Sequence, residues 1–349
     1  MKYIISLLLL FICIFFLFMF VSYLNQNENI TISNNLQFIE YTENNDNKKG
    51  NLNDHKIENL NDKIEILNDH KILAEQDYKK DLQNQTNLQK PYLWIYWENK
   101  PGFGTPAYIN LCMKSIYKHC SQSFNIIKLD QNNIYEYLPE LSFNNINLSK
   151  LLIAQKVDYY RVLLLYKYGG LYIDADTLVL RDPIEIIHKL KLYDYVGFGC
   201  TGINCNYGYG KPSNGIMASR SNGILITRIL NNIEAKLKNT GNNNDNKQWD
   251  YFDLGKLIIW QELEYLINNE NYQYYHYSND YDGTRDVDGN WIETSYLFSD
   301  KYINYKHIDK MFFIILYNSQ MEDLRKLTEE EILNSNYNIS KYFKKSLSN

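Results

Sequence analysis

The chain has 349 residues, a formal net charge of −5, 45% hydrophobic residues and 22% charged residues. This balance is ordinary for a globular protein and excludes a largely disordered chain, while the length allows one large α/β domain with attachments. The mild acidity argues against a nucleic-acid partner, and five cysteines are too few for a disulfide scaffold.

The N-terminus carries a long apolar run, Tyr3–Leu24. About 20 apolar residues at 1.5 Å per residue span a bilayer core of about 30 Å. No small-residue cleavage site is visible, so residues 1–24 are predicted to be a transmembrane signal anchor. Because Lys2 precedes the run and Glu28 follows it, we expect a type II membrane protein. Its remaining chain would face the lumen of the Golgi, the ER or an equivalent secretory membrane.

Residues 25–90 are polar and rich in Asn, Asp, Lys and Glu, which predicts a stem or linker and not a packed core. A degenerate Asn-Asp-Lys-Ile repeat within it spaces apolar residues by three and four. These are Ile57, Leu60, Ile64 and Leu67. Such spacing would suit a short coiled coil that pairs two stems in a homodimer. It covers only about two heptads, so a solvated spacer explains it equally well.

The folded domain is predicted to occupy residues 91–349. It opens with a β-branched and aromatic strand, Tyr92–Trp97, then a loop, a helix over Ile109–His119 and a second strand, Phe124–Leu129. Strand, helix and strand in this order predict an α/β domain with parallel pairing and helices on the faces of the sheet. In such sheets, ligands bind beyond the carboxyl ends of the strands.

The most informative segment follows this opening. Leu151–Tyr168 reads as a helix, Gly169-Gly170 as its end and turn, and Leu171–Leu180 as a strand. Asp158 and Arg161 are three residues apart and share one face of the helix. The final pair, Asp174 and Asp176, is two residues apart on the predicted strand, so both side chains should leave from the same side.

Two neighbouring carboxylates repel each other unless a cation compensates their charge. Mg²⁺ or Mn²⁺ fits, because hard cations prefer oxygen ligands and are often shared with a substrate's phosphates. Such a metal neutralises charge that builds on a leaving group. Asp-x-Asp alone also arises as a solvated turn, and Asp158–Arg161 alone could be a surface ion pair. The apolar strand, the glycine turn and the helix together favour the metal site.

The string Asp158-x-x-Arg161 with Tyr168-Gly-Gly-Leu-Tyr-Ile-Asp174-Ala-Asp176 resembles the signature of DXD-containing glycosyltransferases of the family 32 and capsular polysaccharide synthesis type. Leu93–Trp97 and Asn214–Ser219 also agree with that family. The resemblance covers roughly Tyr92 to Ser319. It implies a GT-A fold, which is a Rossmann-like nucleotide-sugar-binding domain with a mixed central sheet. It also implies metal-dependent transfer of a sugar from a nucleotide-sugar donor to a glycan or glycoconjugate acceptor, with retention of the anomeric configuration.

The resemblance also assigns roles. It implies that the Trp94 indole lines the nucleotide pocket and stacks on the base, and that Asn214 lies near the donor or acceptor sugar. Asp158 and Arg161 would reach sugar hydroxyls and the diphosphate, where the guanidinium supplies several planar donors. The expected donor-binding residues are Trp94, Tyr172, Asp158, Arg161, Asp174 and Asn214. The expected catalytic residues are Asp158, Arg161, Asp174 and Asp176.

For the metal, the resemblance implies that Asp176 is a direct ligand, with Asp174 close to it and to the ribose or sugar. The family often completes the metal shell with a histidine near the C-terminus, but Ile315 stands at that position here. Asn318 or Ser319 could supply an oxygen instead, and His307 is a further candidate. Oxygen ligands would favour harder ions.

Several other segments keep two interpretations. Tyr207–Gly210 could fold over the donor. Aromatic residues at Tyr272–Tyr277 and Trp291 could stack on acceptor sugars or pack in the core. Asp280–Asp288 could be a solvated acidic loop or, less expectedly, a calcium-like site. The cysteine pairs Cys112/Cys120 and Cys200/Cys205 could form disulfides or remain thiols.

Two functions from other classes fit part of the pattern. Asp174-Ala-Asp-Thr177 after an apolar strand also fits the nucleophile motif of HAD-like phosphatases, with Asp174 as the nucleophile. The downstream Lys and acidic pair of that family have no clean match here, and Asp158-x-x-Arg161 would stay unexplained. A non-catalytic, membrane-tethered interaction protein is the other alternative, and it predicts no nucleotide binding.

Overall fold

The computed structural model describes residues 90–142, 146–205, 210–242, 250–305 and 308–348. The chain divides into two compact units, residues 1–87 and 88–349, and every described residue belongs to the second. The predicted anchor and stem therefore lie outside the described residues. Within the described ranges, no helix has the length and apolarity needed to cross a bilayer.

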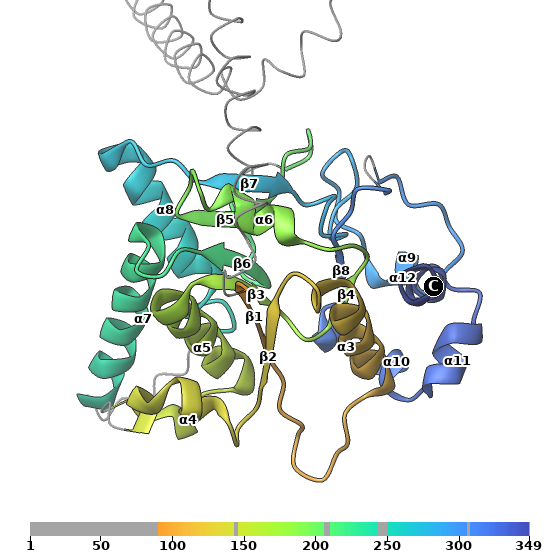
Figure 1. Ribbon diagram of the computed structural model, residues 1–349, viewed down its shortest axis with the longest axis horizontal. Coiled ribbons are helices and arrows are strands. Elements are labelled where there is room, and N and C mark those ends of the chain that lie inside the picture. The colour runs from red at the N-terminus through yellow and green to blue at the C-terminus, as the bar shows by residue number, and fades with distance from the viewer. Residues whose placement is uncertain (1–89, 143–145, 206–209, 243–249, 306–307, 349) are drawn as a thin grey trace, which may run out of the picture. The chain divides into compact units, whose positions relative to one another are not determined.

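Strands and helices alternate along the first half of the domain, and helices dominate the end (Figure 1). The strands are β1 (Tyr92–Tyr96), β2 (Asn125–Leu129), β3 (Gly170–Ile173), β4 (Thr177–Val179), β5 (Tyr195–Gly199), β6 (Ile216–Ser219), β7 (Tyr275–Ser278) and β8 (Phe313–Ile315). The helices are α3 (Ala107–Cys120), α4 (Ile134–Tyr137), α5 (Ile153–Tyr168), α6 (Ile184–Lys189), α7 (Ile224–Asn242), α8 (Lys256–Glu270), α9 (Thr294–Leu297), α10 (Glu322–Arg325), α11 (Glu329–Asn334) and α12 (Asn338–Leu347).

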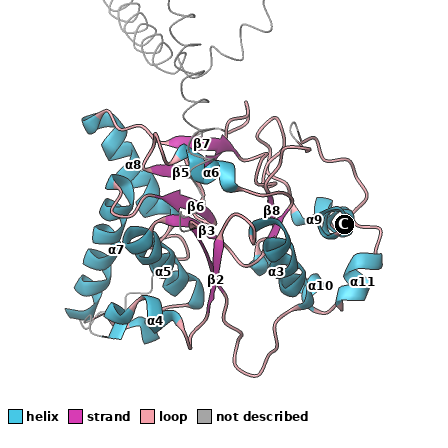
Figure 2. Cartoon of the chain, in the orientation of Figure 1, coloured by secondary structure: helices cyan, strands magenta, loops and turns pink. Residues whose placement is uncertain are grey.

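Six strands form the central sheet in the order β2-β1-β3-β6-β5-β7 (Figure 2). β1 runs parallel to β2 and β3, and β5 runs parallel to β7, while β6 is antiparallel to both of its neighbours. The predicted strand–helix–strand opening is confirmed as β1, α3 and β2. The mixed α/β sheet with helices on its faces is confirmed as well.

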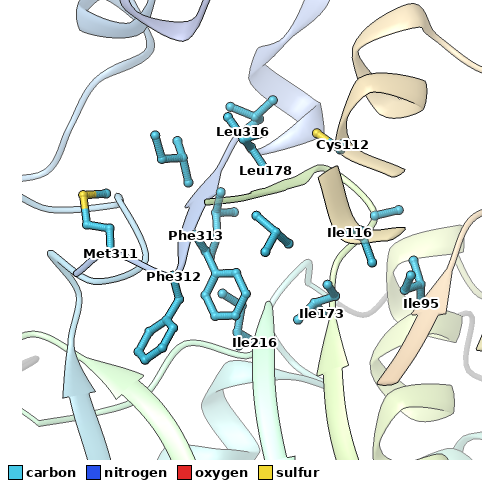
Figure 3. Packing of buried hydrophobic residues seen from close by; sticks show 14 of the residues in the cluster. Ile95, Cys112, Ile116, Ile173, Leu178, Ile216, Met311, Phe312, Phe313 and Leu316 are labelled. Atoms are coloured by element: carbon cyan, nitrogen blue, oxygen red, sulfur yellow. The ribbon is translucent and has the colours of Figure 1, made fainter. Parts of the chain in front are cut away.

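Successive side chains along each strand point to opposite faces of the sheet, so the hydrophobic core is divided between these two faces. Leu93 and Ile95 of β1 pack with α3, β4 and β8 on one face, where Figure 3 shows part of this cluster. Trp94 and Tyr96 point to the other face and pack with α5, α7 and α8. Because both faces are covered, β1 reads as a continuous apolar run, as expected for a buried strand.

The segment after α5 differs from the prediction in one respect. β3 ends at Ile173 and β4, which belongs to a separate two-stranded sheet with β8, begins at Thr177. Asp174–Asp176, hereafter the acidic turn, therefore connects two sheets, and the Thr177 N–H donates to the Asp174 carbonyl at 3.1 Å. The expectation that Leu171–Leu180 is one strand was wrong, because the chain leaves the central sheet at this turn.

The glycine turn before β3 is confirmed. Gly169 ends α5 with φ of 66° and Gly170 continues with φ of 101°, both in the region that favours glycine. A Cβ at Gly170 would collide with the Tyr92 carbonyl oxygen of β1. Glycine thus lets the helix end abruptly and β3 begin beside β1, which directs the acidic turn to the carboxyl end of the sheet.

Candidate active site

Helix α5 brings Asp158 and Arg161 to the end of β3. Both are buried, at 6% and 5% exposure. The Arg161 guanidinium lies 3.1 Å from Asp174 Oδ1 and 3.4 Å from Asp158 Oδ1, measured from Nη2, and its Nη1 donates to the Asn214 carbonyl. One guanidinium therefore links the helix, the acidic turn and the segment before β6. We call Asp158, Arg161, Asp174 and Asp176 the acidic centre.

Asn214 and Gly255 complete the Asp158 side of the acidic centre. The Asn214 amide donates to Asp158 Oδ1 at 2.8 Å. Gly255, just before α8, lies so close that a Cβ there would collide with Asn214 Nδ2 and come within 2.5 Å of Asp158 Oδ2. The sequence alone does not mark Gly255 as a site residue, since its role depends on a contact between distant segments.

Tyr172 contacts both Asp174 of the acidic turn and Arg161. Its ring is fully buried, its hydroxyl donates to Asp174 Oδ1 at 3.3 Å, and the Arg161 Cζ lies 4.8 Å from the ring centroid. The Asp174 side chain stays 28% exposed. Tyr172 therefore holds Asp174 and Arg161 in place, which is a positioning contact and not a surface open to a donor.

Asp176 is anchored by the C-terminal part of the domain. The Asn318 backbone N–H donates to Asp176 Oδ2 at 2.5 Å, and the Leu316 N–H donates to the Asp176 carbonyl at 3.1 Å. Asn318 Oδ1 accepts from the Tyr108 hydroxyl and, at 2.8 Å, from Arg325 Nη2. Both lone pairs of that oxygen are engaged, so Asn318 does not offer the expected side-chain oxygen to a metal.

Ser319 and His307 are the other two residues that were expected as metal ligands. Ser319 is exposed and adjacent to Asn318, so it stays a prediction. His307 lies outside the described residues. Across the described ranges, no group of three or more His, Cys, Asp or Glu residues is arranged to hold a metal ion.

Trp94 does not have the expected role. Its side chain is fully buried, and its indole N–H donates to the Gly169 carbonyl at 2.8 Å. Tyr92 stacks on the ring at 4.8 Å between centroids, with Tyr168 and Tyr137 packed at 5.2 and 5.5 Å. The expectation that this indole stacks on a nucleotide base was wrong, because tyrosines from three segments enclose it.

The acidic centre carries more negative charge than Arg161 can neutralise. Burial raises the pKa of Asp158 to about 7, and burial together with the charge of Asp174 raises the pKa of Asp176 to about 7. Burial also raises the pKa of Asp174, and Arg161 opposes that shift. Ionising all three carboxylates leaves two uncompensated negative charges. A divalent cation would neutralise them, and hard oxygen donors are the ligands that Mg²⁺ and Mn²⁺ take.

Tyr251 lies near the acidic centre. Its side chain is exposed, and burial of its hydroxyl together with the charges of Asp174 and Asp158 raises its pKa. No motif in the sequence marks Tyr251, so its proximity to these carboxylates is a finding of the structure. The Tyr207–Gly210 loop, in contrast, falls outside the described residues except for Gly210.

The aromatic segments differ in exposure. Tyr277 is buried against Phe198 and Phe312, so the packing interpretation holds for the inner part of the Tyr272–Tyr277 segment. Trp291 is 40% exposed and packs on Tyr317 with 4.9 Å between ring centroids. Trp291 thus remains available at the surface.

The acidic loop and the cysteines also have clear outcomes. Asp282 is buried and accepts hydrogen bonds from Asn279 and Thr284, so a loop solvated along its whole length was the wrong expectation. Cys200 and Cys205 form a disulfide. Cys112 and Cys120 are buried free thiols.

A family model described as "Capsular polysaccharide synthesis protein" matches residues 37–335. That match begins inside the segment predicted to be a stem. No curated protein matches the chain.

Three solved glycosyltransferase structures are similar at low identity. GlyE of Streptococcus pneumoniae TIGR4 is 13% identical, with 75% of this chain and 61% of that chain covered and a TM-score of 0.40. The PaToxG glycosyltransferase is 17% identical, with coverages of 52% and 70% and a TM-score of 0.33. A glycosyltransferase involved in glycosylation of the major capsid of PBCV-1 is 12% identical, with coverages of 68% and 100% and a TM-score of 0.34.

Proposed function

The chain belongs to the capsular polysaccharide synthesis protein family and is a glycosyltransferase, and from this premise we propose a metal-dependent reaction with a nucleotide-sugar donor. The acceptor would be a glycan or glycoconjugate. The observation that carries the proposal is the acidic centre beyond the carboxyl end of β3, where one guanidinium pairs with Asp158 and Asp174, and where the buried Asp176 follows in the same turn. The phosphatase and the non-catalytic alternatives do not account for membership in this family.

The residues present fit a divalent cation. Asp174 and Asp176 would hold the ion through their carboxylates, and the donor's diphosphate and water would complete its shell, as is usual for Mg²⁺-type sites. When bound, the ion supplies charge neutralisation for the departing nucleoside diphosphate. Arg161 fixes Asp174, and Asn214 fixes Asp158, so that both carboxylates keep one orientation while the donor binds.

The remaining parts of the proposal rest on different observations. The mixed sheet, with its helical layers and the site beyond β3, supports a GT-A fold. Retention of the anomeric configuration rests on the resemblance of the Asp158–Asp176 segment, and NMR of the product's anomeric proton tests it. A membrane anchor in residues 3–24 with a lumenal catalytic domain agrees with the Cys200–Cys205 disulfide, since disulfides persist in oxidising compartments. The homodimer through the stem stays a prediction.

The decisive experiment replaces Asp176 by Asn and measures sugar transfer from a panel of nucleotide-sugars with Mn²⁺. We expect the rate to fall by at least ~10²-fold, as when one preorganised electrostatic group is lost. Chelation of divalent metal should abolish wild-type transfer. Asp309→Asn is the matched control, because Asp309 is an exposed carboxylate whose ion pair with Lys345 lies at the surface. Full activity of Asp176→Asn, or of the chelated enzyme, would refute the metal-dependent mechanism.

A further inference from the structure

The Trp291 side chain is joined to the acidic centre by a short series of contacts. Its ring packs on the Tyr317 ring with 4.9 Å between the two centroids. Tyr317 directly precedes Asn318, whose backbone N–H donates to Asp176 Oδ2 at 2.5 Å. These contacts and standard covalent geometry keep the centre of the Trp291 ring within about 14 Å of that carboxylate. Trp291 is therefore close enough to contact a substrate that reacts at the acidic centre.

Trp291 combines an open side chain with a fixed backbone. The residue is 40% exposed even though its ring packs on Tyr317. Its backbone pairs with Arg285 in an isolated antiparallel bridge, and the next N–H, of Ile292, donates to the Thr284 carbonyl at 2.9 Å. An aromatic ring that is held in place before its ligand arrives binds that ligand at a lower cost in entropy.

The turn before Trp291 is also held by the disulfide-closed segment Cys200–Cys205. The Asn204 N–H donates to the Asp288 carbonyl at 2.8 Å. The Asn204 side-chain amide donates to Asn290 Oδ1 at 2.9 Å. Because the two turns are hydrogen-bonded to each other, the backbone that carries Trp291 is supported from two sides.

Tyr317 has an uncommon backbone conformation that serves the same arrangement. Its φ of 51° and ψ of 79° lie in the left-handed region, which residues other than glycine rarely adopt. The neighbouring backbone is held on both sides of it, because the N–H groups of Leu316 and Asn318 both donate to Asp176. Strained residues of this kind cluster at functional sites. Here the strain accompanies an aromatic contact with Trp291 on one side and a contact with Asp176 on the other.

Hydrogen-bonding side chains lie around the exposed ring. The Arg285 guanidinium carbon is 5.5 Å from the Trp291 centroid, and Glu293 is exposed two residues further along the chain. The exposed Gln320 lies beside this segment, because its Oε1 accepts from the Thr294 hydroxyl at 2.6 Å. A sugar ring matches such a surface, since its C–H groups pack on an aromatic face while its hydroxyls need polar partners at the edge.

The position of the two rings in the fold favours the acceptor over the nucleotide. In α/β sheets, a nucleotide binds beyond the carboxyl ends of the parallel strands, which here include β1, β2 and β3. Trp291 lies between β7 and β8, and Tyr317 follows β8, which belongs to the separate two-stranded sheet. The two rings are thus contributed by segments outside the expected nucleotide-binding strands.

We propose that Trp291 and Tyr317, hereafter the aromatic platform, bind a sugar ring of the acceptor. The inference rests on the proposed function and assigns a position to its second substrate. In the transfer step, the acceptor hydroxyl oxygen forms a bond to C1 of the donor sugar. The bond between C1 and the diphosphate oxygen breaks, its electron pair stays on the phosphate, and the hydroxyl proton is released to solvent. The aromatic platform orients the acceptor for this step.

Acceptor kinetics test the aromatic platform in the full-length chain, with Mn²⁺, the nucleotide-sugar panel and the methyl glycosides of glucose, galactose, mannose and N-acetylglucosamine. With the best glycoside, Trp291→Ala should raise the acceptor KM about tenfold, as when an anchoring aromatic side chain is truncated. Trp291→Phe keeps a flat ring and should recover most of this loss. Trp291→Leu keeps apolar packing on Tyr317 without a flat ring, so its KM should resemble that of Trp291→Ala.

Tyr265→Ala is the matched control for these variants. Tyr265 is 47% exposed, and the Arg228 guanidinium carbon lies 4.3 Å from its ring centroid, so it is another exposed ring beside an arginine. Its acceptor KM should equal that of the wild type. An acceptor KM that stays at the wild-type value in both Trp291→Ala and Trp291→Leu would overturn the proposal.

Affinity for the nucleoside diphosphates ADP, CDP, GDP and UDP, measured with Mn²⁺, distinguishes the acceptor from the nucleobase as the bound group. The nucleoside diphosphate that binds the wild type should bind all three Trp291 variants equally well, which also shows that they fold. Weaker binding to Trp291→Ala and Trp291→Leu would assign the ring to the nucleobase or to the fold, and would overturn the proposal.

The wild type itself distinguishes failure of the aromatic platform from failure of the proposed function. Release of nucleoside diphosphate with water as the acceptor reports donor turnover without any bound sugar acceptor. A wild type that releases it with water but transfers to none of the four glycosides would overturn the aromatic platform alone. If no nucleotide-sugar is turned over with either water or a glycoside, the proposed function fails, and the aromatic platform fails with it.

Discussion

Asp176 is 8% exposed, and burial together with the Asp174 charge raises its pKa from the ordinary value of about 4 to about 7. The folded protein therefore binds a proton at this carboxyl more tightly than the unfolded chain does. Stability falls as pH rises through this interval, and the full cost is present above pH 7. A carboxylate that destabilises the metal-free fold at neutral pH is expected where a cation is bound.

Replacing Asp176 by Asn should consequently stabilise the metal-free protein while it abolishes transfer. Asn keeps an oxygen that accepts from the Asn318 N–H and carries no charge. We expect a gain on the order of 2–4 kcal/mol at pH 8, seen as a melting temperature raised by several degrees, and no gain below pH ~4. Thermal unfolding in EDTA across this pH range measures it, with Asp309→Asn as the control. A variant that is less stable at pH 8 would contradict the assigned cost of burial.

Arg161 touches two carboxylates and a carbonyl oxygen with a single planar group. A lysine ammonium is a point charge on a flexible stem and cannot reach all three. Arg161→Lys should lower kcat/KM at least ~10-fold, measured with a saturating acceptor. The equivalent change at Arg228, whose half-exposed guanidinium pairs with Glu262 at 2.8 Å, should have little effect on transfer. Wild-type kinetics for Arg161→Lys would mean that one charge alone suffices here.

At the scale of elements, the N-terminus of α8 closes the acidic centre through Gly255. A methyl group there would displace Asn214 and the Asp158 carboxylate, which are the flexible ends of their side chains. Gly255→Ala should therefore fold but lose at least ~10-fold in transfer rate, since small displacements at a reacting centre are costly. Gly104→Ala is the matched control, because nothing lies within 4 Å of a Cβ at Gly104. Equal activity of the two variants would remove Gly255 from the site.

The sequence predicts the elements that are formed by residues close together along the chain. Helical spacing places Asp158 and Arg161 on one face of α5, and the two glycines before β3 predict the turn between α5 and β3. The structure confirms both predictions. The turn at Asp174–Asp176 escapes this reasoning. The segment Leu171–Leu180 is apolar on both sides of its two aspartates, and this pattern does not show that its two halves join different sheets.

Contacts between distant segments explain the other differences. Trp94 reads as a ligand-stacking residue until Tyr137 and Tyr168 are seen to enclose it. Asn318 reads as a possible ligand until Tyr108 and Arg325 are seen to engage its oxygen. Residue type and spacing carry no information about such partners. The chemistry of a site can therefore be predicted from the sequence even when the residues that form it are only partly identified.

At the scale of the whole molecule, the described sheet and both of its cores are built from residues after position 90. Lys90 donates to the Ser121 carbonyl at 2.9 Å, and the Pro91 carbonyl accepts from the Asn125 N–H at 2.9 Å. The compact unit that holds these contacts begins at residue 88, whereas the family match begins at residue 37. Truncated chains that start on either side of residues 37–87 test whether this segment is part of the fold.

A chain that lacks residues 1–87 should keep the melting temperature and the Mn²⁺-dependent nucleotide binding of a chain that lacks only residues 1–36. The reason is that β1, which lies inside the sheet between β2 and β3, remains complete in both. A third chain that starts at Trp97 is the control, because losing β1 removes four fully or nearly fully buried side chains and should prevent folding. If the chain starting at residue 88 aggregates while the one starting at residue 37 folds, the segment between them belongs to the catalytic domain.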